Sequence, residues 1–116
     1  ESPANLFGRP DDGNSLVAQI RVIIGDDLSI DLPNFEDVAN TLHTSPQTLL
    51  RRLKKEGLTY QELKDQLRRD SALFYLEKGD LTIQQVAQKL GFSEPSTFHR
   101  AFKKWTGITP GAFRQD

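Results

Sequence analysis

The 116-residue sequence contains no cysteine and no methionine, only one tryptophan and two histidines. Without cysteine the chain has neither a disulfide framework nor a thiolate metal ligand. No long apolar run is present, so neither a transmembrane span nor a secretory signal is expected. The hydrophobic content of 36% is still too high for a disordered chain. We therefore expect a globular protein of the cytoplasm, and a piece of a longer one because it begins at Glu1 without any Met.

The net charge of −1 hides an uneven distribution of charged residues along the chain. Residues 1–44 carry eight acidic and two basic side chains, a balance of −6. Residues 45–116 carry 13 basic and eight acidic side chains, a balance of +5. Because asymmetry between two parts of a chain bears on the choice of partner, the basic part remains a candidate for binding a polyanion.

Helical periodicity and helix-end signals predict an all-α fold of seven helices, with no convincing strand. Residues 1–13 hold two Pro and two Gly and are expected to form a linker or an N-terminal arm. We expect helices at 14–24 with Asn14 as the cap, and then at 35–42, 45–56, 59–78, 82–90, 93–106 and from 109 onward.

Capping residues set the expected ends of these helices. Ser45 and Ser93 are polar caps, and Thr59–Glu62 and Thr82–Gln85 match the capping box. The long helix that follows Thr59 spans roughly 30 Å at 1.5 Å per residue. Its expected apolar positions are Leu63, Leu67, Leu73, Phe74 and Leu76.

The chain contains an internal repeat, because residues 38–63 align with residues 86–113. Val-Ala pairs, single leucines and Lys-Lys pairs recur in the same order in both copies, and each copy ends in a Gly-Leu/Ile-Thr segment. Each copy reads as a short helix, a tight turn and a longer basic helix. This order is the outline of a helix-turn-helix.

The two longer helices have the same division into an apolar and a polar face. At about 100° per residue the apolar sides carry Leu49 and Leu53 in one helix, and Phe98 and Phe102 in the other. Gln, Ser, Thr, Arg and Lys spread over the opposite sides. Gln suits adenine and Arg suits guanine in the major groove, while Lys is a point charge for phosphate. One such face is more simply a solvated surface, but two in matching register favour DNA binding.

At these residues the sequence resembles the AraC/XylS family of bacterial transcription regulators. The segments that carry the resemblance are LHTSPQTLLRRLKKEGLTYQELKDQLRR (42–69) and LGFSEPSTFHRAFKKWTGITPGAFR (90–114). The resemblance implies two helix-turn-helix subdomains joined by the long helix, whose length is close to one B-DNA repeat of about 34 Å. It also implies an activator that binds double-stranded promoter DNA and RNA polymerase, with a separate effector and dimerisation domain before Glu1. The expected organisation is an arm (1–13), a first subdomain with the long helix (14–78) and a second subdomain (79–116).

The resemblance also places the DNA contacts. We expect the strongest sequence specificity from Gln47, Arg51 and Arg100, whereas the Leu and Pro side chains can only touch thymine methyl groups or shape the backbone. The expected base-reading residues are Gln47, Thr48, Leu50, Arg51, Pro95, Ser96, Thr97, His99 and Arg100. The expected phosphate contacts are Thr44, Ser45, Lys54, Lys55, Lys103 and Lys104.

Several residues allow a second interpretation. His43 and His99 lack other ligands at metal-binding spacing, so no metal is expected, and His99 is either a DNA contact or solvated. Glu94 is expected to favour the helix N-terminal dipole rather than to read a base. Trp105 is expected in the core rather than as a stacking platform. The acidic segment 26–37 is either a solvated surface or a contact for the further domain or RNA polymerase.

No nucleophile–base constellation and no phosphate-cradling glycine loop is present, so neither an enzyme nor a cofactor is expected. A protein-interaction module remains the alternative to DNA binding, and the acidic N-terminal third favours it. A small-molecule sensor would need a pocket that this short chain is not expected to enclose. The residues themselves reveal neither the operator nor the effector, and they do not decide between activation and repression; activation is expected from the resemblance alone.

Overall fold

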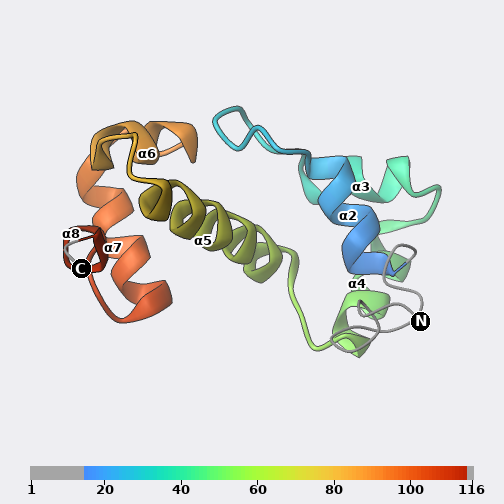
Figure 1. Ribbon diagram of the computed structural model, residues 1–116. Coiled ribbons are helices and arrows are strands. Elements are labelled where there is room, and N and C mark those ends of the chain that lie inside the picture. Colours follow the sequence, from blue (N-terminus) through green and yellow to red (C-terminus); the bar gives the residue numbers. More distant parts are fainter. Residues whose placement is uncertain (1–14, 115–116) are drawn as a thin grey trace, which may run out of the picture. The chain divides into compact units, whose positions relative to one another are not determined.

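The computed structural model describes residues 15–114, and these residues form seven helices and no strand, which confirms the all-α prediction. The predicted arm (1–13) and Asn14 lie outside the described residues. The predicted Asn14 cap is wrong, because the first described helix begins after Ser15, whose hydroxyl accepts from the Ala18 amide at 3.1 Å. The helices, drawn in Figure 1, are α2 (Leu16–Ile24), α3 (Phe35–Thr41), α4 (Pro46–Lys55), α5 (Tyr60–Lys78), α6 (Ile83–Lys89), α7 (Pro95–Thr106) and α8 (Pro110–Arg114).

The chain packs as two compact units. In the described part, the first unit comprises residues 15–26 and 33–60 with α2, α3 and α4, and the second comprises residues 27–32 and 61–114 with α5 to α8. This division differs from the predicted boundary at residue 78, because α5 from residue 61 onward, including buried Leu63, Ala72 and Leu76, belongs to the second unit. Residues 27–32, which we call the strap, connect α2 to α3 yet also pack with the second unit.

The core of the first unit takes one apolar stripe from each of its helices. Tyr60 closes this core, since its ring lies 5.8 Å from that of Phe35 and its hydroxyl donates to the Pro33 carbonyl oxygen at 2.6 Å. The buried side chains are Leu16, Ile20, Ile24, Val38, Ala39, Leu49 and Leu53.

The core of the second unit is built around two phenylalanines of α7. Phe98 and Phe102 are fully buried with ring centroids 5.8 Å apart, and the Phe92 and Phe113 rings lie 5.5 Å and 6.0 Å from them respectively. The remaining buried side chains of this unit are Leu28, Leu63, Ala72, Leu76, Val86, Ala87, Leu90 and Pro110.

Phe74 does not join this core, so its predicted inward position is wrong. Its side chain is 58% exposed and lies against Tyr75 and the Lys78 ammonium group. The reason is helical geometry: Phe74 is two residues from both Ala72 and Leu76, which turns it about 200° away from these buried neighbours.

The predicted caps Ser45 and Thr82 are confirmed, and the capping box at Thr59–Glu62 stays a prediction. Thr82 Oγ1 accepts from the Gln85 amide at 3.0 Å and Gln85 Oε1 accepts from the Thr82 amide at 2.8 Å, which confirms the second capping box. The predicted Ser93 cap is wrong, because α7 begins at Pro95 and its cap is Glu94, which makes no side-chain capping bond. Proline is favoured at the first helical position, where its missing N–H costs nothing, so the cap moves to the residue before it.

Candidate nucleic-acid interface

The sequence repeat is also a repeat of backbone structure. In the first copy the Thr44 amide donates to the Ala39 carbonyl at 3.0 Å, and in the second the Phe92 amide donates to the Ala87 carbonyl at 3.0 Å. Each bond closes the end of a short helix and starts the turn toward the longer helix. Helices α3 and α4, and helices α6 and α7, are therefore two copies of a helix-turn-helix.

Both turns contain one residue in the left-handed region. His43 has φ 59° in the first turn, and Gly91 has φ 88° at the aligned position in the second. Non-glycine residues adopt this conformation only occasionally, and His is among the types that do so more often. His43 is therefore a turn residue, and its side chain is exposed.

Helix α4 buries one side and exposes the other, as the sequence predicted. Leu49 and Leu53 are fully buried, and Leu50 is 48% exposed. The exposed residues of the predicted reading and phosphate-binding set in α4 are Gln47, Leu50, Arg51, Lys54 and Lys55.

Ser45 and Thr48 form the N-terminal cap of α4. The Ser45 hydroxyl accepts from the Thr48 amide at 3.1 Å and donates to the Thr48 hydroxyl at 3.0 Å. These two hydroxyls thus start the helix in the free protein, and half-buried Thr44 directly precedes them in the chain. The predicted Ser45 cap is thus confirmed, whereas the bond of Thr48 to that cap was not predicted. Both hydroxyl oxygens keep lone pairs that can still accept a hydrogen bond.

Helix α7 repeats the pattern of α4 over twelve residues. His99 is half-buried with its ring 6.3 Å from the Phe98 ring, so only part of it faces solvent. Trp105 is half-buried and lies 6.2 Å from Phe92, which places it at the edge of the aromatic core. The exposed members of the predicted set in α7 are Pro95, Ser96, Thr97, Arg100, Lys103 and Lys104.

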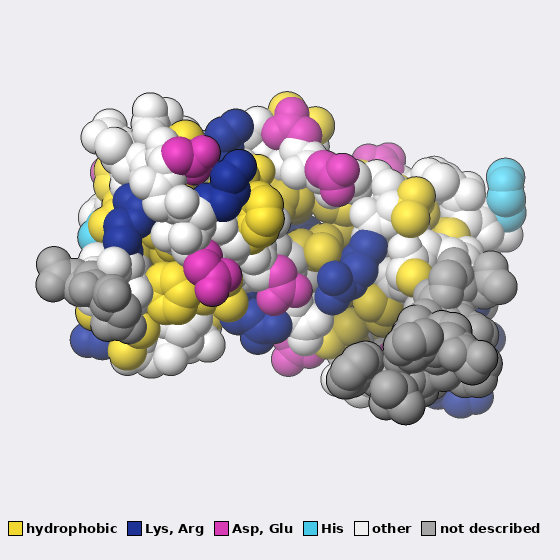
Figure 2. Space-filling view, viewed as in Figure 1, with side chains coloured by type: hydrophobic (Ala, Val, Ile, Leu, Met, Phe, Trp, Pro, Cys, Tyr) yellow, Lys and Arg dark blue, Asp and Glu magenta, His cyan; other side chains and the backbone are white. Residues whose placement is uncertain are grey.

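The basic side chains of α4 and α7 are not used in ion pairs with other described residues. Ion pairs within residues 15–114 instead join Arg69 to Asp70 at 3.2 Å and Lys78 to Asp80 at 3.7 Å. On the face drawn in Figure 2, Lys and Arg side chains lie among Asp and Glu side chains. The positive charge available to a polyanion therefore comes from individual helices rather than from a uniformly basic surface on that face.

Two acidic residues of segment 26–37 have structural tasks. Asp27 accepts from the Ser29 hydroxyl and from the Ser29 amide, and these bonds, aided by Lys89, hold the pKa of the Asp27 carboxyl below its usual value. Asp37 shares a capping box with Asn34, which starts α3. The acidic segment is thus partly explained by turn and cap chemistry.

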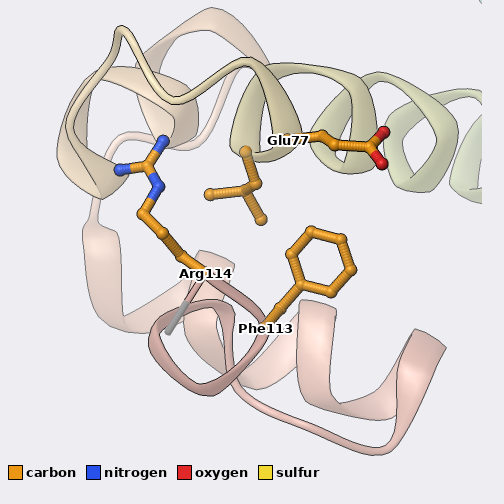
Figure 3. Close-up of a pocket in the computed structure, with 4 residues that line it drawn as sticks. Glu77, Phe113 and Arg114 are labelled. Carbon is orange, nitrogen blue, oxygen red and sulfur yellow. The ribbon is translucent and has the colours of Figure 1, made fainter. Parts of the chain in front are cut away.

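A cavity of about 390 Å³ in the second unit has a lining that the sequence analysis did not single out. Leu76 and Glu77 of α5 and Phe113 and Arg114 of α8 line it. The Nε and Nη2 atoms of Arg114 are buried without a hydrogen-bond partner in the described part of the chain. Figure 3 shows the Arg114 guanidinium and the Glu77 carboxylate pointing in opposite directions. No sequence signal distinguishes Arg114 from the exposed arginines.

Between residues 15 and 114, no helix combines the length and apolarity needed to cross a membrane. Over the same residues, no cluster of three or more His, Asp or Glu side chains is arranged to hold a metal ion.

Comparison with known proteins places these two motifs in a family. A family model described as a helix-turn-helix domain matches residues 38–116. The ornithine utilization regulator of Pseudomonas aeruginosa is 44% identical over 85 residues, which cover 73% of this chain and 25% of that regulator.

Solved structures give the same result. The transcriptional regulator CdpR of Pseudomonas aeruginosa matches with a TM-score of 0.72 and 37% identity, covering 87% of this chain and 30% of that protein. A DNA-binding transcriptional dual regulator of Escherichia coli K-12 shares the fold with a TM-score of 0.77 at 24% identity, covering 88% of this chain and 95% of that one. The chain spans about a quarter of the length of the curated regulator named above. It belongs to the AraC-type helix-turn-helix family of bacterial transcriptional regulators, whose members bind specific DNA sequences and are not enzymes.

Proposed function

We propose that α4 and α7 are recognition helices that read two adjacent major-groove segments of a promoter. The observation that carries this proposal is the duplicated geometry: the same turn leads twice into a helix that buries apolar residues and exposes Gln, Ser, Thr, Arg and Lys. A major groove about 12 Å wide admits one α-helix, so two such helices suit two groove segments.

Within these helices we assign base reading to the side chains with the most specific hydrogen-bonding groups. Gln47 offers an amide for adenine, and Arg51 and Arg100 offer guanidinium forks for guanine. All three side chains are exposed. Exposed Leu50 and Pro95 have no side-chain donor, so they contribute apolar contacts such as those with thymine methyl groups.

The remaining polar residues complete the proposed interface. Ser96 and Thr97 stand exposed at the start of α7, and half-buried His99 offers part of its ring. The lysines of α4 and α7 bind phosphates, which fixes the register of the protein on the duplex but carries no sequence information. Thr44, Ser45 and Thr48 lie at the N-terminus of α4, where backbone N–H groups also suit a phosphate.

We assign to α5 the coupling of the two motifs. Its 19 residues form one uninterrupted helix, about 28 Å long at 1.5 Å per residue. A continuous helix transmits orientation better than a flexible linker, so binding of one motif favours binding of the other.

The wider role of the protein is also a proposal. The curated relatives are about four times longer than the matched segment, which supports a further domain that senses an effector or dimerises. Exposed acidic residues such as Asp31 and Glu36 are candidates for contact with that domain or with RNA polymerase. We place the protein in the bacterial cytoplasm, and activation is the expected outcome, measured by transcription in vitro from a bound promoter.

A titration of labelled duplex DNA, followed by fluorescence anisotropy, tests DNA binding against the alternative of a protein-interaction module. Counterion release requires that log K fall steeply with log salt between roughly 50 and 200 mM. Sites selected from a random pool should bind more tightly than a scrambled duplex of equal composition. Binding that ignores both salt and sequence would contradict the proposal and favour the interaction module.

A further inference from the structure

The strap is held on the second unit by a buried side chain. Leu28 is only 4% exposed, whereas Ile30, two residues later, is 59% exposed. The Asp27 carboxylate accepts from the Ser29 amide at 3.0 Å, which folds the strap into a tight local turn around Leu28. The strap is therefore anchored at one point and open to solvent elsewhere.

The backbone of the strap lies directly against the turn of the second helix-turn-helix. A Cβ atom placed on Gly91 would lie 2.6 Å from the Leu28 carbonyl oxygen and 3.8 Å from the Leu28 carbonyl carbon. Ordinary carbon–oxygen contacts are no shorter than about 3.3 Å, so a side chain at position 91 and the strap cannot keep these positions together. Glycine at this position makes the close approach possible.

The first repeat shows that the turn itself does not require glycine. The aligned residue there is His43, which carries a full side chain at φ 59° with the same hydrogen bond closing the turn. Gly57 and Gly107 also have positive φ, at 74° and 89°, but a Cβ on either would meet nothing within 4 Å. What distinguishes Gly91 is the strap above it.

We infer that the strap is a positioning element for the second recognition helix: the Leu28 backbone, seated on Gly91, holds the α6–α7 turn and thereby the orientation of α7. This inference rests on the proposed reading of DNA by α7. In this proposal Leu28 and Gly91 touch no base and act on α7 only through the α6–α7 turn. The strap and Gly91 belong to the same unit, so this positioning acts within the second unit.

The absence of cysteine from the sequence allows a direct test of strap docking. Leu28→Cys introduces a single thiol at the buried anchor, and Ile30→Cys introduces one at the exposed position. We expect the thiol at position 28 to react with a soluble disulfide reagent at least tenfold more slowly than the thiol at position 30. Equal reactivity would overturn the docking of the strap.

Gly91→Asn and Gly107→Asn form a matched pair, because both glycines have nearly the same φ and asparagine tolerates this region. In the Leu28→Cys background, Gly91→Asn should raise thiol reactivity at least fivefold, while Gly107→Asn should leave it within twofold. If both variants raised the reactivity of the thiol at position 28 to the same extent, or if neither raised it, the seating of the strap on Gly91 would be contradicted.

The positioning role is tested by selecting DNA sites with Gly91→Asn as a single substitution, in a chain without the introduced cysteine. Gly91→Asn should lose base preference in the segment read by α7 and keep it in the segment read by α4. Leu28→Ala leaves the sequence of the α6–α7 turn unchanged and should cause the same loss of base preference. It replaces Gly91→Asn in the test if that variant does not fold. A variant that releases the strap but keeps its full base preference in the segment read by α7 would overturn the positioning role. Failure of the unaltered chain to select any sequence would instead refute the proposed function, while the thiol experiment still decides whether the strap docks.

Discussion

Replacing Arg51 or Arg100 by alanine should weaken binding to the selected DNA site without weakening the fold. Both side chains are exposed, and neither forms an ion pair with another residue in the described part of the chain. Surface substitutions of this kind usually change the unfolding free energy by less than about 0.5 kcal/mol. The substitutions should therefore lower the affinity for DNA and leave the stability of the free protein nearly unchanged.

The expected size of the effect follows from the bidentate contact between arginine and guanine. Such a contact is worth about 1–3 kcal/mol, which corresponds to roughly a 5- to 150-fold loss of affinity for each variant. Because the two arginines lie in different helix-turn-helix copies, the losses should add within about 0.5 kcal/mol in the double variant. Affinity for a scrambled duplex should fall far less, since only one phosphate-attracting charge is lost for each substitution.

Arg52 provides the matched control for Arg51. It is the next residue of α4, it is also exposed, and it lies about 100° further round the helix, outside the proposed reading set. Arg52→Ala should therefore change specific and non-specific binding to the same small extent. The measurement is fluorescence anisotropy at fixed salt, with urea unfolding as a check of stability. Equal losses of specificity for Arg51→Ala and Arg52→Ala would refute the assignment.

Four further predictions concern charge, coupling, burial and pH. Lys104→Ala should weaken binding to all sequences alike and reduce the slope of log K against log salt by about 1, and a sequence-dependent loss would contradict its phosphate role. Leu67→Pro should cost about 3 kcal/mol in urea unfolding and lower the advantage of two-segment over one-segment DNA, whereas an unchanged advantage would count against coupling through α5. Arg114→Met should change the unfolding free energy by less than about 1 kcal/mol, because two of the replaced nitrogen atoms are buried without partners; a loss above about 3 kcal/mol would reveal a strong partner. The pKa of the Asp27 carboxyl lies below its usual 3.8, because Ser29 donates two hydrogen bonds to the carboxylate. The turn that these bonds stabilise should therefore be fully formed above pH 3.8 and be lost as the pH falls through the lowered pKa of folded Asp27. An NMR titration of the Ser29 amide checks this, and a midpoint at or above 3.8 would contradict it.

Much of the fold could be predicted because its signals are local. The caps at Ser45 and Thr82 depend on hydrogen bonds over three residues, and periodicity is enough to place Leu49 and Phe98 inside. The repeat then doubles the weight of each signal, because two copies with the same apolar and polar sides are hard to explain as chance. The exposed polar faces of α4 and α7 could be derived in the same way.

What the sequence did not reveal depends on contacts between distant residues. The strap meets Gly91 more than 60 residues away, and nothing in DDLSIDL indicates which surface buries Leu28. Phe74 was misplaced because a long helix with apolar residues on several sides does not indicate which of them packs inside. Arg114 resembles any surface arginine in sequence, and only the folded unit shows that its nitrogen atoms are buried.

The central claim, that two helices read two separate DNA segments, is tested most directly by selection from a random duplex pool with three proteins. The unaltered chain should select two short motifs whose centres lie about one helical turn, roughly 10 base pairs, apart. Arg51→Ala should lose preference in one motif only, and Arg100→Ala in the other only. A single selected motif, or loss of the same base positions in both variants, would contradict the account.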